Sequence, residues 1–154
     1  MGIRATKNLV TLVLDTSAIL KWVLNEEDSE KARRILDAYL DGALELIAPS
    51  LVFPEAGNVL CRMVRRGKLS RQAARACLRM VVEYSPANED SSDLYELSLD
   101  LALEHRQSYY DCLFLALARA QKCKLVTADE KFFRGMRRAF PEIQLLRDYV
   151  LRSS

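Results

Sequence analysis

Two kinds of hydrophobic pattern alternate along this chain. Residues 9–14 and 124–127 are short runs rich in Val, Leu and Thr, which is typical of strands buried on both faces of a parallel sheet. Shorter strands are predicted at 44–48 and 143–146. Between these runs, apolar residues recur every three or four positions, which is the helical spacing. The alternation predicts one α/β unit with a central, mostly parallel sheet flanked by helices.

Two of the predicted helices follow one another without a strand between them. The first runs from about residue 54 to 66 and stops at Gly67, and Pro54 suits its first helical position. The second begins after Ser70 and continues to about residue 82. The sequence therefore predicts a helical pair in the middle of the chain.

The other helices have equally local signals. An apolar stripe over 32–40 ends before Gly42, and Ser91 or Ser92 is placed to cap a helix that follows. A further helix is predicted to start at Asp111, where Ser108, three residues earlier, resembles a capping box.

Four acidic residues end or open these segments. Asp15 and Asp129 directly follow strand-like runs, whereas Glu55 and Asp111 open helical patterns. The carboxyl ends of parallel strands form the crevice where α/β proteins bind ligands, which places Asp15 and Asp129 at that edge. Each acid taken singly is also explained as a helix cap or as a first-turn charge that favours the helix macrodipole.

Convergence of the four acids changes that interpretation. First-turn and strand-end carboxylates would all point toward one end of the fold, where they repel one another unless a cation neutralises them. Oxygen ligands with no His or Cys nearby suit Mg²⁺ or Mn²⁺ rather than Zn²⁺. The pattern therefore predicts a metal-dependent nuclease site.

The acids stand in four segments with a characteristic order: V-L-D-T-S-A, P-E-x-x-N-V-L, Y-D-C-L-F-L-A-L-A and L-V-T-A-D-E-K-F. In this order and spacing the chain resembles the PIN domain, and specifically the VapC-type toxins of prokaryotic toxin–antitoxin pairs. The resemblance covers residues from about 9 to about 146. It implies that residues 1–154 form a single PIN domain, with three layers and a protruding helical pair.

The resemblance also implies residues and an activity. The family's acidic residues correspond to Asp15, Glu55, Asp111 and Asp129, and its accompanying polar positions to Ser17, Asn58 and Thr127. We expect Asp15, Asp111 and Asp129 to hold Mg²⁺ or Mn²⁺, while Glu55 binds a second ion or orients the attacking water. The implied function is a toxin that hydrolyses RNA. The implied partners are that RNA, a VapB-like antitoxin and a second copy in a homodimer.

Charge distribution bears on RNA binding, because the net charge is only +2. Arg71, Arg75 and Arg79 recur every four residues and form one row on the second helix of the pair. Further basic residues, Arg62, Arg65, Arg66 and Lys68, end the preceding helix, and Lys131, Arg134, Arg137 and Arg138 follow Asp129. A surface that contacts RNA phosphates and an ordinary solvated face both explain this pattern.

The remaining reactive residues favour structural roles. The four cysteines, Cys61, Cys77, Cys112 and Cys123, include no C-x-x-C pair, which favours small buried thiols in a reducing compartment. His105, the only histidine, is interpreted as structural. Trp22 and Leu24 fit either the core or a partner contact. With no membrane-spanning stretch and no signal-peptide core, we expect a cytoplasmic protein.

Two other classes of function stay open on the sequence. In the first, Asp15 is itself phosphorylated, as in phosphoryl-transfer enzymes and receiver-like modules. The chain has no D-x-D after its first strand and no lysine placed at the end of a late strand, which disfavours this class. In the second, the protein is a catalytically silent binding partner, for which intact acids are poor evidence.

Overall fold

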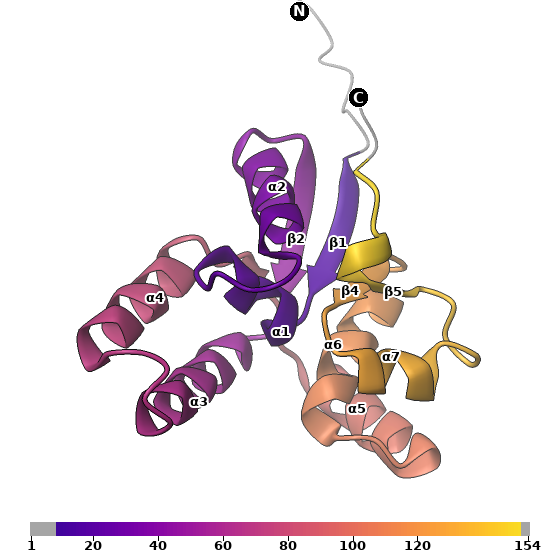
Figure 1. Ribbon diagram of the computed structural model, residues 1–154. Helices are drawn as coiled ribbons and strands as arrows, with labels where there is room; N and C mark the ends of the chain where they lie inside the picture. Colours follow the sequence, from indigo (N-terminus) through magenta and orange to yellow (C-terminus); the bar gives the residue numbers. More distant parts are fainter. Residues whose placement is uncertain (1–8, 152–154) are drawn as a thin grey trace, which may run out of the picture.

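Five parallel strands form the centre of the computed structural model, which describes residues 9–151 (Figure 1). Their order across the sheet is β3-β2-β1-β4-β5, and every neighbouring pair is parallel. The strands are β1 (Val10–Leu14), β2 (Leu44–Ala48), β3 (Ala87–Asn88), β4 (Lys124–Thr127) and β5 (Ile143–Leu145). The predicted α/β class with a central parallel sheet is confirmed.

The central strands are buried on both faces. Leu12 and Leu14 of β1 belong to one hydrophobic core, whereas Val13 belongs to the other. This alternation follows from the two-residue side-chain period of a strand. It explains why the strands have nearly continuous apolar sequences.

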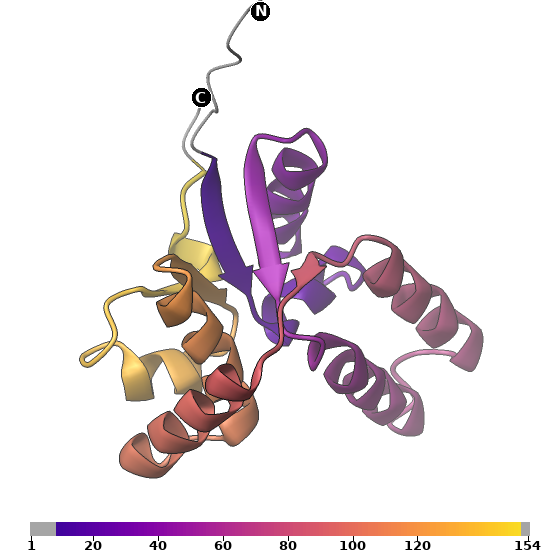
Figure 2. The same cartoon turned by 180° about the vertical axis from the view of Figure 1, so that it is seen from behind.

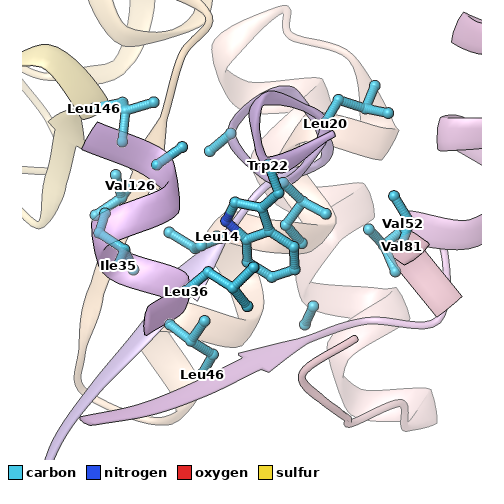
Figure 3. Close-up of a cluster of buried hydrophobic side chains, with 14 of the residues drawn as sticks. Leu14, Leu20, Trp22, Ile35, Leu36, Leu46, Val52, Val81, Val126 and Leu146 are labelled. Carbon is cyan, nitrogen blue, oxygen red and sulfur yellow. The ribbon is translucent and has the colours of Figure 1, made fainter. Parts of the chain in front are cut away.

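The first core lies between the sheet and the helices of the N-terminal half. These are α1 (Thr16–Ile19), α2 (Ser29–Leu40), α3 (Val52–Arg65) and α4 (Arg71–Glu83). Trp22, in a single 3-10 turn at Leu20–Trp22, packs in this core with Ile35 and Leu36 of α2 (Figure 3). Leu24 is also buried there, so both residues belong to the core of the chain.

The second core lies on the opposite face and is covered by α5 (Ser92–His105), α6 (Tyr109–Ala120) and α7 (Glu130–Met136). Every residue of α6 from Cys112 to Ala118 is buried. The view from behind shows α5 and α6 on this side, while α3 and α4 extend away from the sheet as the expected protruding pair (Figure 2). The molecule therefore has three layers.

Several predicted caps and boundaries differ from the structure. Ser70 and Ser91 do cap α4 and α5, accepting from Ala73 N and Leu94 N at 3.0 and 3.3 Å. The predicted capping box at Ser108 is wrong, because the Ser108 side chain makes no capping hydrogen bond. Helix α6 begins at Tyr109 rather than at Asp111.

Helix α3 also starts earlier than predicted, at Val52. Pro54 is therefore its third residue, where the missing N–H costs little because N–H groups of the first turn have no intrahelical partner. Strand β3 is not predicted from the sequence. It has two exposed residues and makes only a short pairing with the end of β2, so it leaves no hydrophobic pattern in the sequence.

All four cysteines are free thiols, as expected, although only Cys112 is fully buried and Cys61 is exposed. His105 packs edge-on against Phe140, with ring centroids 5.0 Å apart, which supports its structural interpretation. Within residues 9–151 no helix is long and apolar enough to cross a membrane.

Topology determines where the site lies. From β1 the chain moves to β2 and β3 on one side, and then returns to β4 and β5 on the other side. The strand order therefore reverses between β1 and β4, and a crevice forms at their carboxyl ends. Asp15 follows β1 directly, and Asp129 lies two residues after β4.

Candidate active site

All four predicted acids line one cavity of about 240 Å³ at this switch point. Its lining comes from the β1–α1 junction, α3, α6 and the start of α7. The described residues around it are Asp15, Thr16, Ser17, Leu20, Glu55, Asn58, Val59, Arg62, Asp111, Phe114 and Asp129. A larger hollow of about 710 Å³ lies at the amino end of β1 and β2, but its described lining includes none of these four acids.

Asp15 is buried and held on both carboxylate oxygens. Ser17 Oγ donates to Oδ1 at 2.6 Å, and the Ala18 N–H donates to the same oxygen at 3.0 Å. The Thr127 hydroxyl donates to Oδ2. With its side chain oriented by three donors and the residue only 6% exposed, Asp15 has a fixed position at the base of the cavity.

The same two hydroxyls connect the ends of β1 and β4. Ser17 Oγ accepts from the Ala128 N–H, and Thr127 Oγ1 accepts from the Asp129 N–H, each at 3.0 Å. Asp129 in turn caps α7 by accepting from the Phe132 N–H at 3.0 Å. The two loops that carry acids are thus tied together by short polar contacts.

Capping and site formation occur together at two of the acids. Asp15 accepts from the Ala18 N–H as the N-cap of α1, and Asp129 is the N-cap of α7. Both nevertheless line the cavity. On the sequence alone the two roles are alternatives, but the structure shows that they are compatible.

Helix α3 contributes a further acid and a contact that sequence reasoning missed. Thr16 Oγ1 donates to Glu55 Oε1 at 2.8 Å, which links the β1–α1 junction to α3. The sequence pattern does not single out Thr16, although it lies beside Asp15 in the D-T-S segment. Asn58 lines the cavity one turn after Glu55.

Burial, together with the charges of neighbouring acids, raises the pKa of three acids that line the cavity. Burial raises the pKa of Asp15 from 3.8 to about 6, although its hydrogen bonds with Ser17, Thr127 and Ala18 partly oppose the rise. The pKa of Asp111 rises from 3.8 to about 7, first through burial and then through the charges of Asp15, Asp129 and Glu55. Burial also raises the pKa of Glu55, and the Thr16 hydroxyl opposes that rise.

Within residues 9–151, no Lys, Arg or His forms an ion pair with any of the four acids. Among the described residues, no group of three or more acidic side chains is arranged to bind a metal ion directly. Such an arrangement is compatible with Mg²⁺, which binds through one or two carboxylates and keeps several of its waters. The all-oxygen donors, the raised pKa values and the absence of a pairing cation in this part of the chain fit a hard divalent ion.

The predicted arginine row lies elsewhere. Arg71, Arg75 and Arg79 are all exposed on α4, and none of them lines the acidic cavity. Arg75 and Arg79 instead border a surface hollow with Leu78 and Val82. His105 is also absent from the cavity lining, so no histidine is available there as a general base.

A parallel sheet with four carboxylates at its switch point defines an acidic site, and comparison with known proteins identifies the family to which this fold belongs. Residues 12–137 match the PIN domain family model. Ribonuclease VapC3 of Pyrobaculum aerophilum is 34% identical over 122 residues, covering 78% of this chain and 90% of that protein. The chain belongs to the PIN-domain family and is grouped there with the VapC ribonucleases.

Solved structures show the same fold. A crystal structure from Pyrobaculum aerophilum aligns with a TM-score of 0.67 at 22% identity, covering 90% of this chain and 92% of that one. A toxin–antitoxin complex from Klebsiella pneumoniae aligns with a TM-score of 0.59 at 19% identity, covering 91% and 99% of the two chains. These similarities extend the PIN-like architecture over nearly the whole described chain.

The raised pKa values predict that the metal-free protein loses stability as pH rises. A group whose folded pKa exceeds its unfolded pKa binds more protons in the folded state. The contribution of Asp15 and Asp111 to the free energy of unfolding is therefore fully present below about pH 4 and is lost as pH rises to about 7. The Asp111 side chain makes no hydrogen bond within residues 9–151, so its replacement by Asn breaks none there. We therefore expect Asp111→Asn to relieve this loss of stability. Each kcal/mol regained raises the melting temperature by roughly 2–4 °C.

Thermal scans in EDTA at pH 4 and pH 8 measure this effect. The two proteins should melt together at the lower pH and separate at the higher one, with the variant more stable. When Mn²⁺ is added, wild type should gain more than the variant, because the ion binds only the folded site. A variant that melts lower than wild type at pH 8 in EDTA would remove Asp111 from the repulsive cluster.

Asp129 allows capping to be separated from the site. Asp129→Asn keeps a good N-cap but removes the charge, whereas Asp129→Ala removes both, at an added cost of ~0.5–2 kcal/mol. We therefore expect different stabilities but the same weakened response to Mn²⁺. If Asp129→Asn responds to Mn²⁺ as wild type does, Asp129 acts only as a cap.

Proposed function

We propose that this protein is the toxin of a toxin–antitoxin pair, and that it hydrolyses RNA phosphodiester bonds with the help of Mg²⁺ or Mn²⁺. One observation carries the proposal: four carboxylates from separate segments converge on a single cavity in which no basic side chain of the described residues pairs with them. The relationship to VapC ribonucleases supports the reaction class.

The carboxylates divide into two groups. Asp15, Asp111 and Asp129 would hold the cation, directly or through its waters, while Glu55 would bind a second ion or orient the attacking water. A bound divalent ion lowers the pKa of water and neutralises charge on the phosphate, so no covalent nucleophile is needed. Ser17 and Thr127 orient Asp15 through their hydroxyl groups, and Thr16 orients Glu55.

Glu55 is suited to contact water rather than to lie deep in the site. One of its oxygens accepts from Thr16, which leaves the other available toward the cavity. Its raised pKa makes it a better proton acceptor than an ordinary glutamate, because a base is most effective when its pKa approaches the working pH. Asn58, one turn further along α3, supplies an amide at the same wall.

Phosphorylation of Asp15 fits the geometry less well. Both oxygens of its carboxylate accept hydrogen bonds, and the residue is almost fully buried. An attacking oxygen must approach phosphorus freely, so these bonds would have to break first. Incubation with an acyl phosphate should therefore give no covalent adduct on the protein.

The partners follow from the family. We propose a VapB-like antitoxin, since a related fold is known from a toxin–antitoxin complex. A homodimer, a cytoplasmic location and a single domain spanning residues 1–154 remain predictions from the sequence. Light scattering from the purified chain, alone and with its antitoxin, would give the molar mass that tests the first of these.

Asp111→Asn and Asp15→Asn are expected to reduce RNA cleavage at least ~100-fold in Mg²⁺ and to relieve growth inhibition, because each removes a charge that stabilises the cation and the developing phosphate charge. Single-turnover cleavage of a total RNA pool measures this. EDTA should abolish cleavage by wild type.

Two controls accompany that assay. Glu45→Gln changes an exposed acid of β2 and should leave cleavage unchanged. Circular dichroism should show folded variants, which matters most for Asp15 because an amide cannot accept at both positions. EDTA-sensitive cleavage at the wild-type rate by Asp111→Asn would contradict the assignment, and a wild type that neither binds Mn²⁺ nor cleaves RNA would support a silent binding protein.

We also propose that the arginine row of α4 binds RNA phosphates. Changing Arg71, Arg75 and Arg79 together to glutamate should weaken RNA binding. The slope of log affinity against log salt concentration should become shallower by ~0.7 for each phosphate that the row no longer binds. The response to Mn²⁺ should not change, because the row lies outside the acidic cavity. An unchanged salt slope, measured by fluorescence anisotropy, would assign the row to a solvated face or a protein interface.

A further inference from the structure

Helix α3 presents a basic residue to the acidic cavity. Of the described residues that line it, Arg62 is the only one with a cationic side chain. Glu55, Asn58 and Arg62 are three and four residues apart in turn, so they lie along one face of the helix. The face that supplies the cavity with an acid and an amide therefore ends in a guanidinium group.

The guanidinium group of Arg62 has no polar partner among residues 9–151. Arg62 is exposed, and its side chain makes no hydrogen bond or ion pair with any residue in 9–151. The four acids of the cavity likewise form no ion pair with a residue in that range. Arg62 thus borders four carboxylates without being neutralised by them, which leaves its donors available to another anion.

An RNA strand that approaches this cavity encounters repulsion. The four carboxylates repel a phosphodiester, and a bound cation offsets only part of that charge. A guanidinium at the rim attracts the phosphate, and its planar fork matches two phosphate oxygens at once. The other arginines of the region do not line the cavity, so this role falls to one residue.

We propose that Arg62 binds the non-bridging oxygens of the phosphodiester that is cut, and so positions the RNA over the acidic cavity. This inference rests on the proposed function and extends it to a substrate contact. It separates Arg62 from Arg65 of the same helix, which does not line the cavity and for which we propose no RNA contact, and from the α4 row, whose contacts would lie along the strand away from the cut.

Arg62→Gln, Arg62→Lys and the control Arg65→Gln test the proposal. Arg65 is exposed on the same helix, one turn further on, and does not line the cavity. At saturating RNA in Mn²⁺, Arg62→Gln should lower the single-turnover rate ~100-fold. Arg62→Lys should recover only part of it, because lysine keeps the charge but not the fork. The control should match wild type.

A second measurement does not depend on cleavage. In an Asp111→Asn background, which we expect to be inactive, fluorescence anisotropy of a short single-stranded RNA should show ~10-fold weaker binding for Arg62→Gln and a salt slope smaller by ~0.7. Arg65→Gln should leave the slope unchanged. In the otherwise wild-type protein, Arg62→Gln should keep the full melting-temperature gain with Mn²⁺, which shows an intact acidic site.

The outcomes distinguish this inference from the proposed function. If wild type cleaves RNA and Arg62→Gln matches it in rate, affinity and salt slope, Arg62 belongs to a solvated face and the inference is wrong. If Arg62→Gln instead loses the Mn²⁺ response, its role is structural, which also overturns the inference. A wild type that binds no RNA and shows no Mn²⁺ response would overturn both proposals.

Discussion

The burial of carboxylates close to one another in a single cavity is the constraint around which the carboxyl edge of the sheet is arranged. Burial raises the pKa of Asp15, Glu55 and Asp111, and the charges of Asp15, Asp129 and Glu55 raise that of Asp111 further. Hydroxyl groups of Ser17, Thr127 and Thr16 orient two of the acids but do not neutralise them. A divalent cation would, and binding it would return the stability that crowding removes.

The fold produces this crowding with ordinary local structure. The strand order reverses between β1 and β4, so that the segments after both strands enter one crevice. Each segment then begins a helix, and Asp15 and Asp129 cap those helices with the carboxylates that also line the cavity. The same two side chains thus cap helices and belong to the proposed site. A substitution that spares the cap but removes the charge is consequently more informative than an alanine.

Much of this architecture follows from the sequence, because its signals are local. Buried strands need continuous apolar runs, and Ser70 and Ser91 mark two helix starts directly. The four acids are identifiable because each stands at such a boundary. Strand β3 leaves no signal since its two residues are exposed, and Ser108 matches a capping pattern that the backbone does not use. The hydrogen bond from Thr16 to Glu55 and the position of Arg62 at the cavity depend on how distant segments pack together, which one sequence does not reveal.

We propose that these acids form one coupled site that releases protons when it binds a cation. Calorimetric titration of Mn²⁺ into the protein, repeated at pH 6 and pH 8.5 in buffers of different ionisation enthalpy, measures the protons released per ion bound. Because carboxylates with raised pKa values must be deprotonated to bind metal, we predict release near ~pH 6 and almost none near ~pH 8.5. Tight binding with no proton release at either pH, or no binding at all, would contradict the account.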